Sequence, residues 1–232
     1  MRGQSLIRLV SMLRSETGRS TKIAVGVDDA ENLKNALQIQ QEILYDEHDW
    51  SHLRRMYPAI TLNAGQRYYD LPDGFNFDRI EKAAIRIGGR PIPFLRGISF
   101  EEYAIFDSDA GARATPAQRW DIRDVAGATQ IEVWPIPVDN SNQMQFVGLR
   151  ELNALVDDDD TADLDDILIV KYAAAGILAH AGDPDAQIKL KEAAARLSRL
   201  KGRSAAGRSD IRLGMGGQVT RPDRAIIHIS GR

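Results

Sequence analysis

The chain has 232 residues, 43% hydrophobic and 27% charged, which is long enough to bury a sizeable core. It has no cysteine, which excludes disulfides, thiolate nucleophiles and cysteine-ligated zinc. No stretch approaches the ~20 apolar residues of a membrane-spanning helix, and arginines interrupt the apolar residues of the opening segment. We therefore expect a soluble, non-exported protein with neither a membrane span nor a secretory signal.

Charge is distributed unevenly along the chain. The net charge is −3, yet residues 201–232 hold seven basic and two acidic side chains, so this tail is +5 and residues 1–200 carry −8. A basic tail on an acidic body indicates a segment that binds another macromolecule.

Helical periodicity marks the two ends of the body. Apolar residues at three- and four-residue spacing predict a helix over 5–16 and a second one from Asp28 that ends between Glu47 and Met56, before Pro58. The second helix is expected to bury a broad face, made of Leu33, Ala36, Leu37, Ile39, Ile43, Leu44 and Trp50.

Two more helices are predicted after the acidic run. Asp163 is expected to cap a buried helix, and Asp183 followed by Pro184 predicts the start of a last helix that ends before Gly202.

Between residues 58 and 150 the hydrophobic period changes to two, which predicts antiparallel strands. Residues 60–62 and 67–71 are expected to pair as one hairpin, and Gly88-Gly89 and Ala126-Gly127 to turn two others. A further strand is predicted around Phe146, and a short helix capped by Ser99 lies between the strands.

Neither helical half has enough partners alone, so the two halves are expected to pack together. The predicted fold class is α+β: a helical bundle formed by the N- and C-terminal helices, with an inserted antiparallel β module and an extended C-terminal arm. The predicted boundaries are 1–57 and 151–201 for the bundle, 58–150 for the β module, and 202–232 for the basic arm.

No motif predicts catalysis, a cofactor or a metal. His48 and His52 are spaced i, i+4, but the segment lacks the His-Glu-x-x-His pattern of zinc enzymes, so solvated imidazoles at a helix end are favoured over a metal site. The glycine clusters do not join a strand to a helix as nucleotide-binding loops do.

An acidic run precedes the third predicted long helix. Residues 157–166 contain seven aspartates but lack the glycine turn and final glutamate of a calcium loop, so a solvated linker is favoured. Its negative charge suits a helix N-terminus.

The order of several short motifs resembles the head-to-tail adaptor proteins of tailed bacteriophages, the class that includes podovirus tail tubular protein A. The resemblance lies in ALQIQQEI at 36–43, DWSHL at 49–53, ITLNAGQRYYDLP at 60–72, FEEY at 100–103, IEVWPIP at 131–137 and the alanine-rich segment 172–181. It spans most of residues 5–200.

The resemblance implies a structural virion protein at the head-tail interface, present in the host cytoplasm during assembly. It implies a ring, twelve-fold like the portal, that binds below the portal, extends the DNA channel and docks the tail or nozzle. We expect the free protein to be monomeric, and DNA to pass without specific binding because an acidic lumen does not hold phosphates. Asp157, Asp158, Asp159 and Asp160 are the candidate lumen-facing residues.

The arm is the candidate surface for the portal or a neighbouring subunit, because an extended segment can add a strand to a sheet edge while its arginines pair with acidic groups. Its candidate residues are Arg203, Arg208, Arg212, Arg221, Arg224, Ile226, Ile227 and Ile229.

Two other function classes stay open. One is a nucleic-acid-binding module that uses the basic tail, although the tail has no aromatic residue for base stacking. The other is a hydrolase or metalloprotein centred on His48 and His52.

Overall fold

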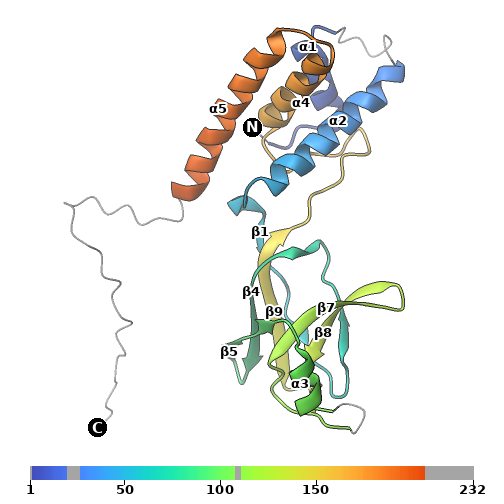
Figure 1. Ribbon diagram of the computed structural model, residues 1–232, viewed down its shortest axis with the longest axis vertical. Coiled ribbons are helices and arrows are strands. Elements are labelled where there is room, and N and C mark those ends of the chain that lie inside the picture. The colour runs from blue at the N-terminus through green and yellow to red at the C-terminus, as the bar shows by residue number, and fades with distance from the viewer. Residues whose placement is uncertain (1, 20–26, 108–110, 207–232) are drawn as a thin grey trace, which may run out of the picture.

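The computed structural model describes residues 2–19, 27–107 and 111–206. Four long helices form one end of an elongated molecule and the strands form the other (Figure 1). Helices plus antiparallel sheets confirm the predicted α+β class, with the strands lying between the N- and C-terminal helices in the sequence.

The helical end is built from both ends of the sequence. Its helices are α1 (Leu6–Glu16), α2 (Val27–Asp46), α4 (Asp166–His180) and α5 (Asp185–Ala206). In α1 the predicted stripe is buried, with Leu6, Leu9 and Leu13 fully inaccessible. These side chains pack against α4, whose leucine, isoleucine and alanine side chains are buried around most of its circumference.

The apolar face of α2 is narrower than predicted. Leu33, Leu37 and Leu44 are buried, whereas Ile39 and Ile43 are 56% and 53% exposed. A helix buries only the stripe that faces its neighbours, and α2 packs on α1 and α4 from one side.

Two helix boundaries differ from prediction. Asp165, not Asp163, caps α4, and its side chain accepts a hydrogen bond from the Leu168 N–H. The carboxylate of Asp163 is instead bound by Arg150, at 3.0 Å from its Nη1. The last helix was predicted to end before Gly202 but continues to Ala206. Its predicted start is confirmed, because the Asp183 side chain accepts the Asp185 N–H at 2.9 Å.

Strands β1 (Arg54–Met56) and β9 (Asn142–Arg150), with the start of β4 (Phe75–Ile87) on the other side of β9, join the two ends of the molecule. The second helix ends at Asp46, before the predicted range, and the 3₁₀ turn Ser51–Leu53 leads into β1. Strand β1 pairs antiparallel with β9, with Met56 opposite Val147. Strand β9 serves both cores, because Leu149 packs with the helices and Phe146 with the sheets.

Two sheets enclose the second core. One has the order β1-β9-β4-β5, with β2 (Ile60–Thr61) also on β9; its other strands are β4 (Phe75–Ile87) and β5 (Arg90–Pro93). The other has the order β3-β8-β7-β6, formed by β3 (Tyr68–Asp70), β8 (Ala128–Trp134), β7 (Arg119–Val125) and β6 (Leu95–Arg96). All pairs are antiparallel except β6 with β7. Buried aromatic side chains meet between the sheets, as when the Phe146 ring contacts the Trp120 ring at 4.9 Å.

The predicted turns at Gly88-Gly89 and Ala126-Gly127 are confirmed. Each connects paired neighbours, β4 with β5 and β7 with β8, and all four turn residues have positive φ. This is the geometry of two-residue hairpins whose turn matches the strand twist.

The predicted hairpin of 60–62 with 67–71 is wrong. Strand β2 pairs with β9 and β3 pairs with β8, so the two segments belong to different sheets. The connection crosses between the layers, where the Tyr69 hydroxyl accepts the Asn63 N–H at 2.9 Å. Pairing and burying the two short strands on the longer strands β9 and β8 stabilises the chain more than a local hairpin between them would.

The predicted short helix is confirmed as α3 (Phe100–Ile105). Ser99 and Glu102 form a reciprocal capping box at its start. It lies at the far end of the β region from the long helices (Figure 1).

Candidate functional site

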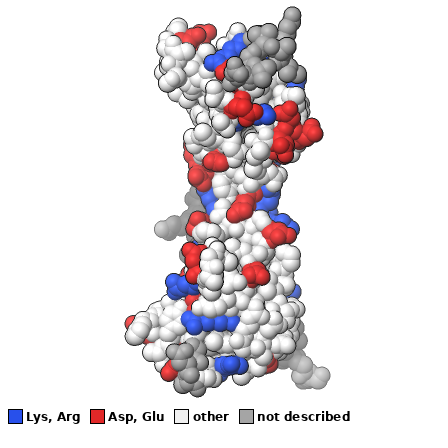
Figure 2. Space-filling model, turned by 90° about the vertical axis from the view of Figure 1, so that its right-hand side faces the viewer, with Lys and Arg blue, Asp and Glu red and all other residues white. Residues whose placement is uncertain are grey.

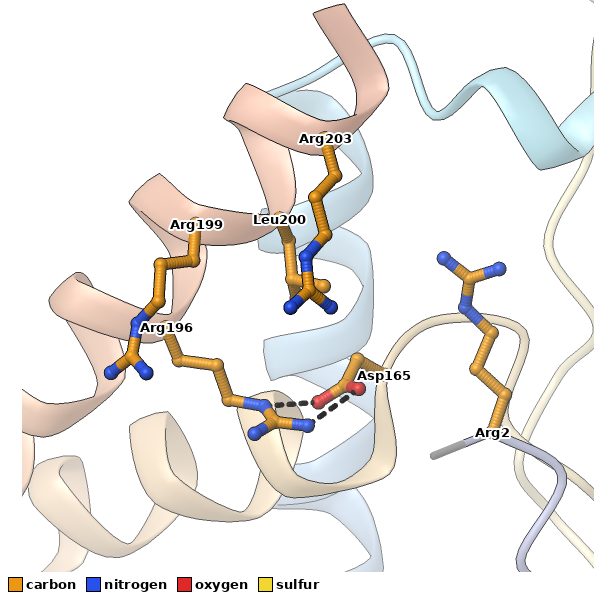
Figure 3. Close-up of a pocket in the computed structure, with 6 residues that line it drawn as sticks. All are labelled: Arg2, Asp165, Arg196, Arg199, Leu200 and Arg203. Carbon is orange, nitrogen blue, oxygen red and sulfur yellow. Dashed lines mark hydrogen bonds and ion pairs between the residues drawn. The ribbon is translucent and has the colours of Figure 1, made fainter. Parts of the chain in front are cut away.

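An arginine-lined pocket lies between α5 and the segment that leads into α1 and α4 (Figure 3). Its volume is about 420 Å³, and it is hereafter the arginine pocket. The lining residues are Arg2, Asp165, Arg196, Arg199, Leu200 and Arg203. Arg199 and Arg203 stand one helical turn apart on α5, and Arg2 comes from the opposite wall.

The one acidic side chain of the pocket is already engaged. Arg196 donates two hydrogen bonds to the Asp165 carboxylate, at 2.6 and 2.8 Å. Burial alone would raise the pKa of the Asp165 carboxyl, but the Arg196 guanidinium and the Leu168 N–H hold that pKa below its usual value. By contrast, Arg2, Arg199 and Arg203 are exposed, and within residues 2–19, 27–107 and 111–206 no carboxylate pairs with them. The pocket therefore offers cationic groups to an external anion.

The acidic run folds into a tight turn, residues 157–160, hereafter the acidic turn. The Asp160 side chain accepts the N–H groups of Val156 and Asp157 at 2.8 and 2.7 Å, and the Asp160 N–H donates to the Asp157 carbonyl. These backbone N–H groups lower the pKa of the Asp160 carboxyl.

The acidic turn also holds the start of α1. The carbonyls of Asp160 and Asp158 accept the N–H groups of Leu6 and Ile7, at 2.7 and 3.1 Å. These are N–H groups that a helix cannot satisfy internally. The turn is therefore an ordered structural element and not only a solvated linker; its predicted lumen-facing position stays a prediction.

An apolar groove of about 590 Å³ runs between α2 and α4. Ala36 and the exposed Ile39 contribute to it from α2, and Tyr172, Gly176 and Ile177 from α4. These side chains leave α2 with an apolar strip that no other residue of the described ranges covers.

The two histidines considered as a metal pair do not form one. The second helix ends before them, so they do not share a helical face; instead each imidazole contacts the Trp50 ring edge-on, with ring centroids 5.1 Å (His48) and 6.1 Å (His52) apart. The His52 Nε2 is 2.9 Å from the Asp163 carbonyl, and burial lowers the pKa of this imidazole. In the part of the chain that the structure describes, no group of three His, Asp or Glu side chains is placed to hold a metal.

Sequence reasoning missed a buried carboxylate in the β region. Glu132 of β8 is 1% exposed and is bound by Arg67, Arg123 and the Tyr103 hydroxyl. Burial raises the pKa of Tyr103, and the bonds to Tyr103 and Glu132 raise the pKa of Arg123. Because each partner comes from a different element, the cluster fixes α3 and β7 against β8 and plays a structural part. An acidic residue inside the apolar run 131–136 was the available signal.

The predicted arm residues are only partly placed. Arg203 lies on α5 and lines the arginine pocket, so its assignment to an extended arm is corrected. The helix continues because Arg203, Ser204 and the alanines after it carry ordinary helix propensity, so Gly202 alone does not end it. Arg208, Arg212, Arg221, Arg224, Ile226, Ile227 and Ile229 lie outside the described residues.

Comparison with known families settles the class of protein. The family model for SU10 adaptor protein matches residues 9–221, nearly the whole chain. The chain belongs to the SU10 adaptor protein family. A search of curated proteins found no match.

Membership of the SU10 adaptor family makes the chain a structural adaptor of a bacteriophage, with a place at the head-tail junction of the virion. This agrees with the predicted resemblance to head-to-tail adaptors and supports a structural role over a catalytic one. Within the described ranges, no helix of this SU10 adaptor family member is long and apolar enough to cross a membrane.

Proposed function

We propose that the chain binds below the portal as a ring, extends the DNA channel and docks the tail or nozzle. The observation that carries this proposal is the SU10 adaptor family match over residues 9–221. The shape supports it, because helices and sheets form two separate ends of one elongated subunit (Figure 1). An adaptor needs two such ends to meet two different partners.

Exposed apolar side chains favour a protein contact at the β end. Phe100 and Ile105 of α3 are 83% and 70% exposed at the tip farthest from the long helices. Apolar side chains left in water at one tip are typical of a surface that another protein covers. One of the two partners, the portal or the tail, binds here.

The ring is assembled on the portal. A twelve-fold ring follows from matching the portal, and the free protein is monomeric, because the surface charge of the body keeps separate copies apart until they are held side by side. Sedimentation of the purified protein is expected to show a 25.7 kDa species.

The DNA channel is lined by a body of net negative charge. Residues 1–200 carry −8, which opposes phosphate binding and lets the genome pass without specific contacts. The arm beyond Ala206 adds a further contact with the portal or an adjacent copy.

The test is reconstitution on DNA-filled, portal-bearing heads that lack this protein. Added protein is expected to cosediment with the heads, to protect the packaged DNA from nuclease, and to form a symmetric ring at the portal in averaged electron micrographs. Heads that neither bind the protein nor retain DNA better with it would contradict the proposal. Retention on bare DNA at low salt, with steep loss as salt is added, would favour the nucleic-acid-binding alternative.

A further inference from the structure

The arginine pocket carries positive charge that the described chain does not neutralise. The pocket encloses about 420 Å³; Arg203 extends from α5 toward Arg2 on the opposite wall, and Arg199, one turn earlier on α5, extends beside Arg196 at the pocket edge (Figure 3). All three side chains are exposed and lack a carboxylate partner in residues 2–19, 27–107 and 111–206. Arginine binds carboxylates with two parallel hydrogen bonds, as Arg196 already does with Asp165 in the same pocket.

The acidic turn presents the complementary groups on a fixed backbone. Asp157 and Asp159 are exposed, and neither pairs with a cation in the described ranges. Asp158 is held by Lys34 at 2.9 Å, and Asp160 is held by the N–H groups of its own turn. Because the turn is already ordered, little conformational entropy is lost when its two free carboxylates meet a partner.

The α5 wall of the arginine pocket and the acidic turn lie on opposite flanks of the helical end. The segment from β9 to α4, which contains the acidic turn, runs along α2 through bonds to Lys34, Gln38 and Gln41. Helix α5 packs on α4 at the other side, on the left of Figure 1, with α2 and this segment on the right. Figure 2 turns that right-hand flank toward the viewer, and Asp and Glu side chains gather on its helical half.

We infer that the acidic turn of one copy binds the arginine pocket of the next copy around the ring. This inference rests on the proposed ring. A ring of identical subunits needs two different, complementary surfaces on opposite flanks of one chain, and this pair of features meets that requirement. It places the acidic turn between subunits, in place of the lumen-facing position expected from the sequence.

The experiment reverses charge on each side separately. Arg199→Glu with Arg203→Glu makes the pocket acidic, and Asp157→Lys with Asp159→Lys makes the turn basic. A matched control, Arg86→Glu with Arg90→Glu, makes the same charge change at exposed arginines of the β region that have no ion-pair partner in the described chain. Circular dichroism of each free protein checks that the fold is kept.

Each reversed protein alone is expected to load about tenfold fewer copies onto portal-bearing heads than the wild type, because every subunit contact then joins like charges. The control protein is expected to load normally. An equal mixture of the two reversed proteins is expected to recover loading, because each reversed pocket then meets the reversed turn of the other protein. One chain carrying all four substitutions should recover it too.

Four results would overturn the inference. If the wild type forms rings and the reversed proteins load as well as it does, the contact lies elsewhere while the proposed function stands. If both reversed proteins fail and neither the mixture nor the fourfold variant recovers, the two surfaces do not meet. If only the pocket variant fails and it also loses salt-sensitive DNA retention, the pocket binds phosphates. Failure of the wild type itself to load would contradict the proposed ring, and the inference with it.

Discussion

Arg196 of α5 donates two hydrogen bonds to the carboxylate of Asp165, which is also the residue that caps α4. One buried side chain thus both starts a helix and ties the next helix to it. Because α4 is the central helix of the bundle, this pair connects local helix formation to tertiary packing.

Asp165→Asn is expected to lower the free energy of unfolding by about 2 kcal/mol at pH 7, because asparagine keeps the cap but loses the charged pair. The pKa of Asp165 is lowered in the folded state, so its contribution is present above the unfolded pKa, about 3.9, and is lost as pH falls through the folded value. Urea unfolding of both proteins at pH 7 and near pH 2 measures this. A difference that stays the same at both pH values would contradict the assignment.

Glu132→Gln is expected to destabilise the protein by about 2 kcal/mol, because Arg67 and Arg123 lose the carboxylate they share. Both arginines are partly exposed and turn toward water, which keeps the cost below that of a fully buried pair. The control is Glu31→Gln, which breaks a solvent-screened surface pair with Lys34 and is expected to leave the melting temperature nearly unchanged. Equal melting temperatures for the two variants would show that the cluster is not structural.

Gly148→Ala is expected to cost about 2–3 kcal/mol, because a Cβ at this position would lie 2.5 Å from the Arg79 carbonyl oxygen and 2.9 Å from the Ile80 Cα. Both are backbone atoms of the bulged strand β4, so they cannot move aside cheaply. The matched control is Gly202→Ala in α5, where nothing lies within 4 Å of the new Cβ and helix propensity predicts a gain of up to about 1 kcal/mol. Thermal unfolding followed by circular dichroism is expected to show a lower melting temperature for Gly148→Ala and a higher one for Gly202→Ala. A lower melting temperature for both variants would contradict the prediction.

The β region is expected to be removable. Because Met56 lies opposite Val147, replacing residues 57–146 by Asn-Gly joins β1 to β9 as a two-residue hairpin. Trp50, Leu53, Leu149 and Leu155 stay in place, so the helical core keeps its apolar side chains. A soluble monomer with strong helical circular dichroism is the expected result; loss of helical signal would show that the helices depend on the β module.

Truncation after Ala206 tests the predicted arm. Every buried core side chain of the described structure precedes residue 207, so the melting temperature is expected to stay unchanged. Attachment to portal-bearing heads is expected to fall, because Arg208, Arg212, Arg221, Arg224, Ile226, Ile227 and Ile229 are removed. Normal attachment with no DNA leakage would leave the arm without a role in binding. Cutting after Arg203 is a poorer test, because it shortens α5 beside the arginine pocket.

The sequence by itself determined the α+β class, the helix of residues 6–16, the short helix capped by Ser99 and the hairpins at Gly88-Gly89 and Ala126-Gly127. These features depend on local interactions, because an apolar stripe, a helix cap and a positive-φ turn each specify the structure of only a few neighbouring residues.

Only the tertiary structure decided the rest. Residues 60–71 carry a local turn signal in the sequence, yet their two strands pair with β9 and β8 and so belong to different sheets. Asp165 caps α4 in place of Asp163, whose carboxylate is bound by Arg150. The arginine pocket brings Arg2 together with Arg199 and Arg203, which lie about 200 residues away in the sequence. Periodicity within one segment cannot predict a contact between residues this far apart.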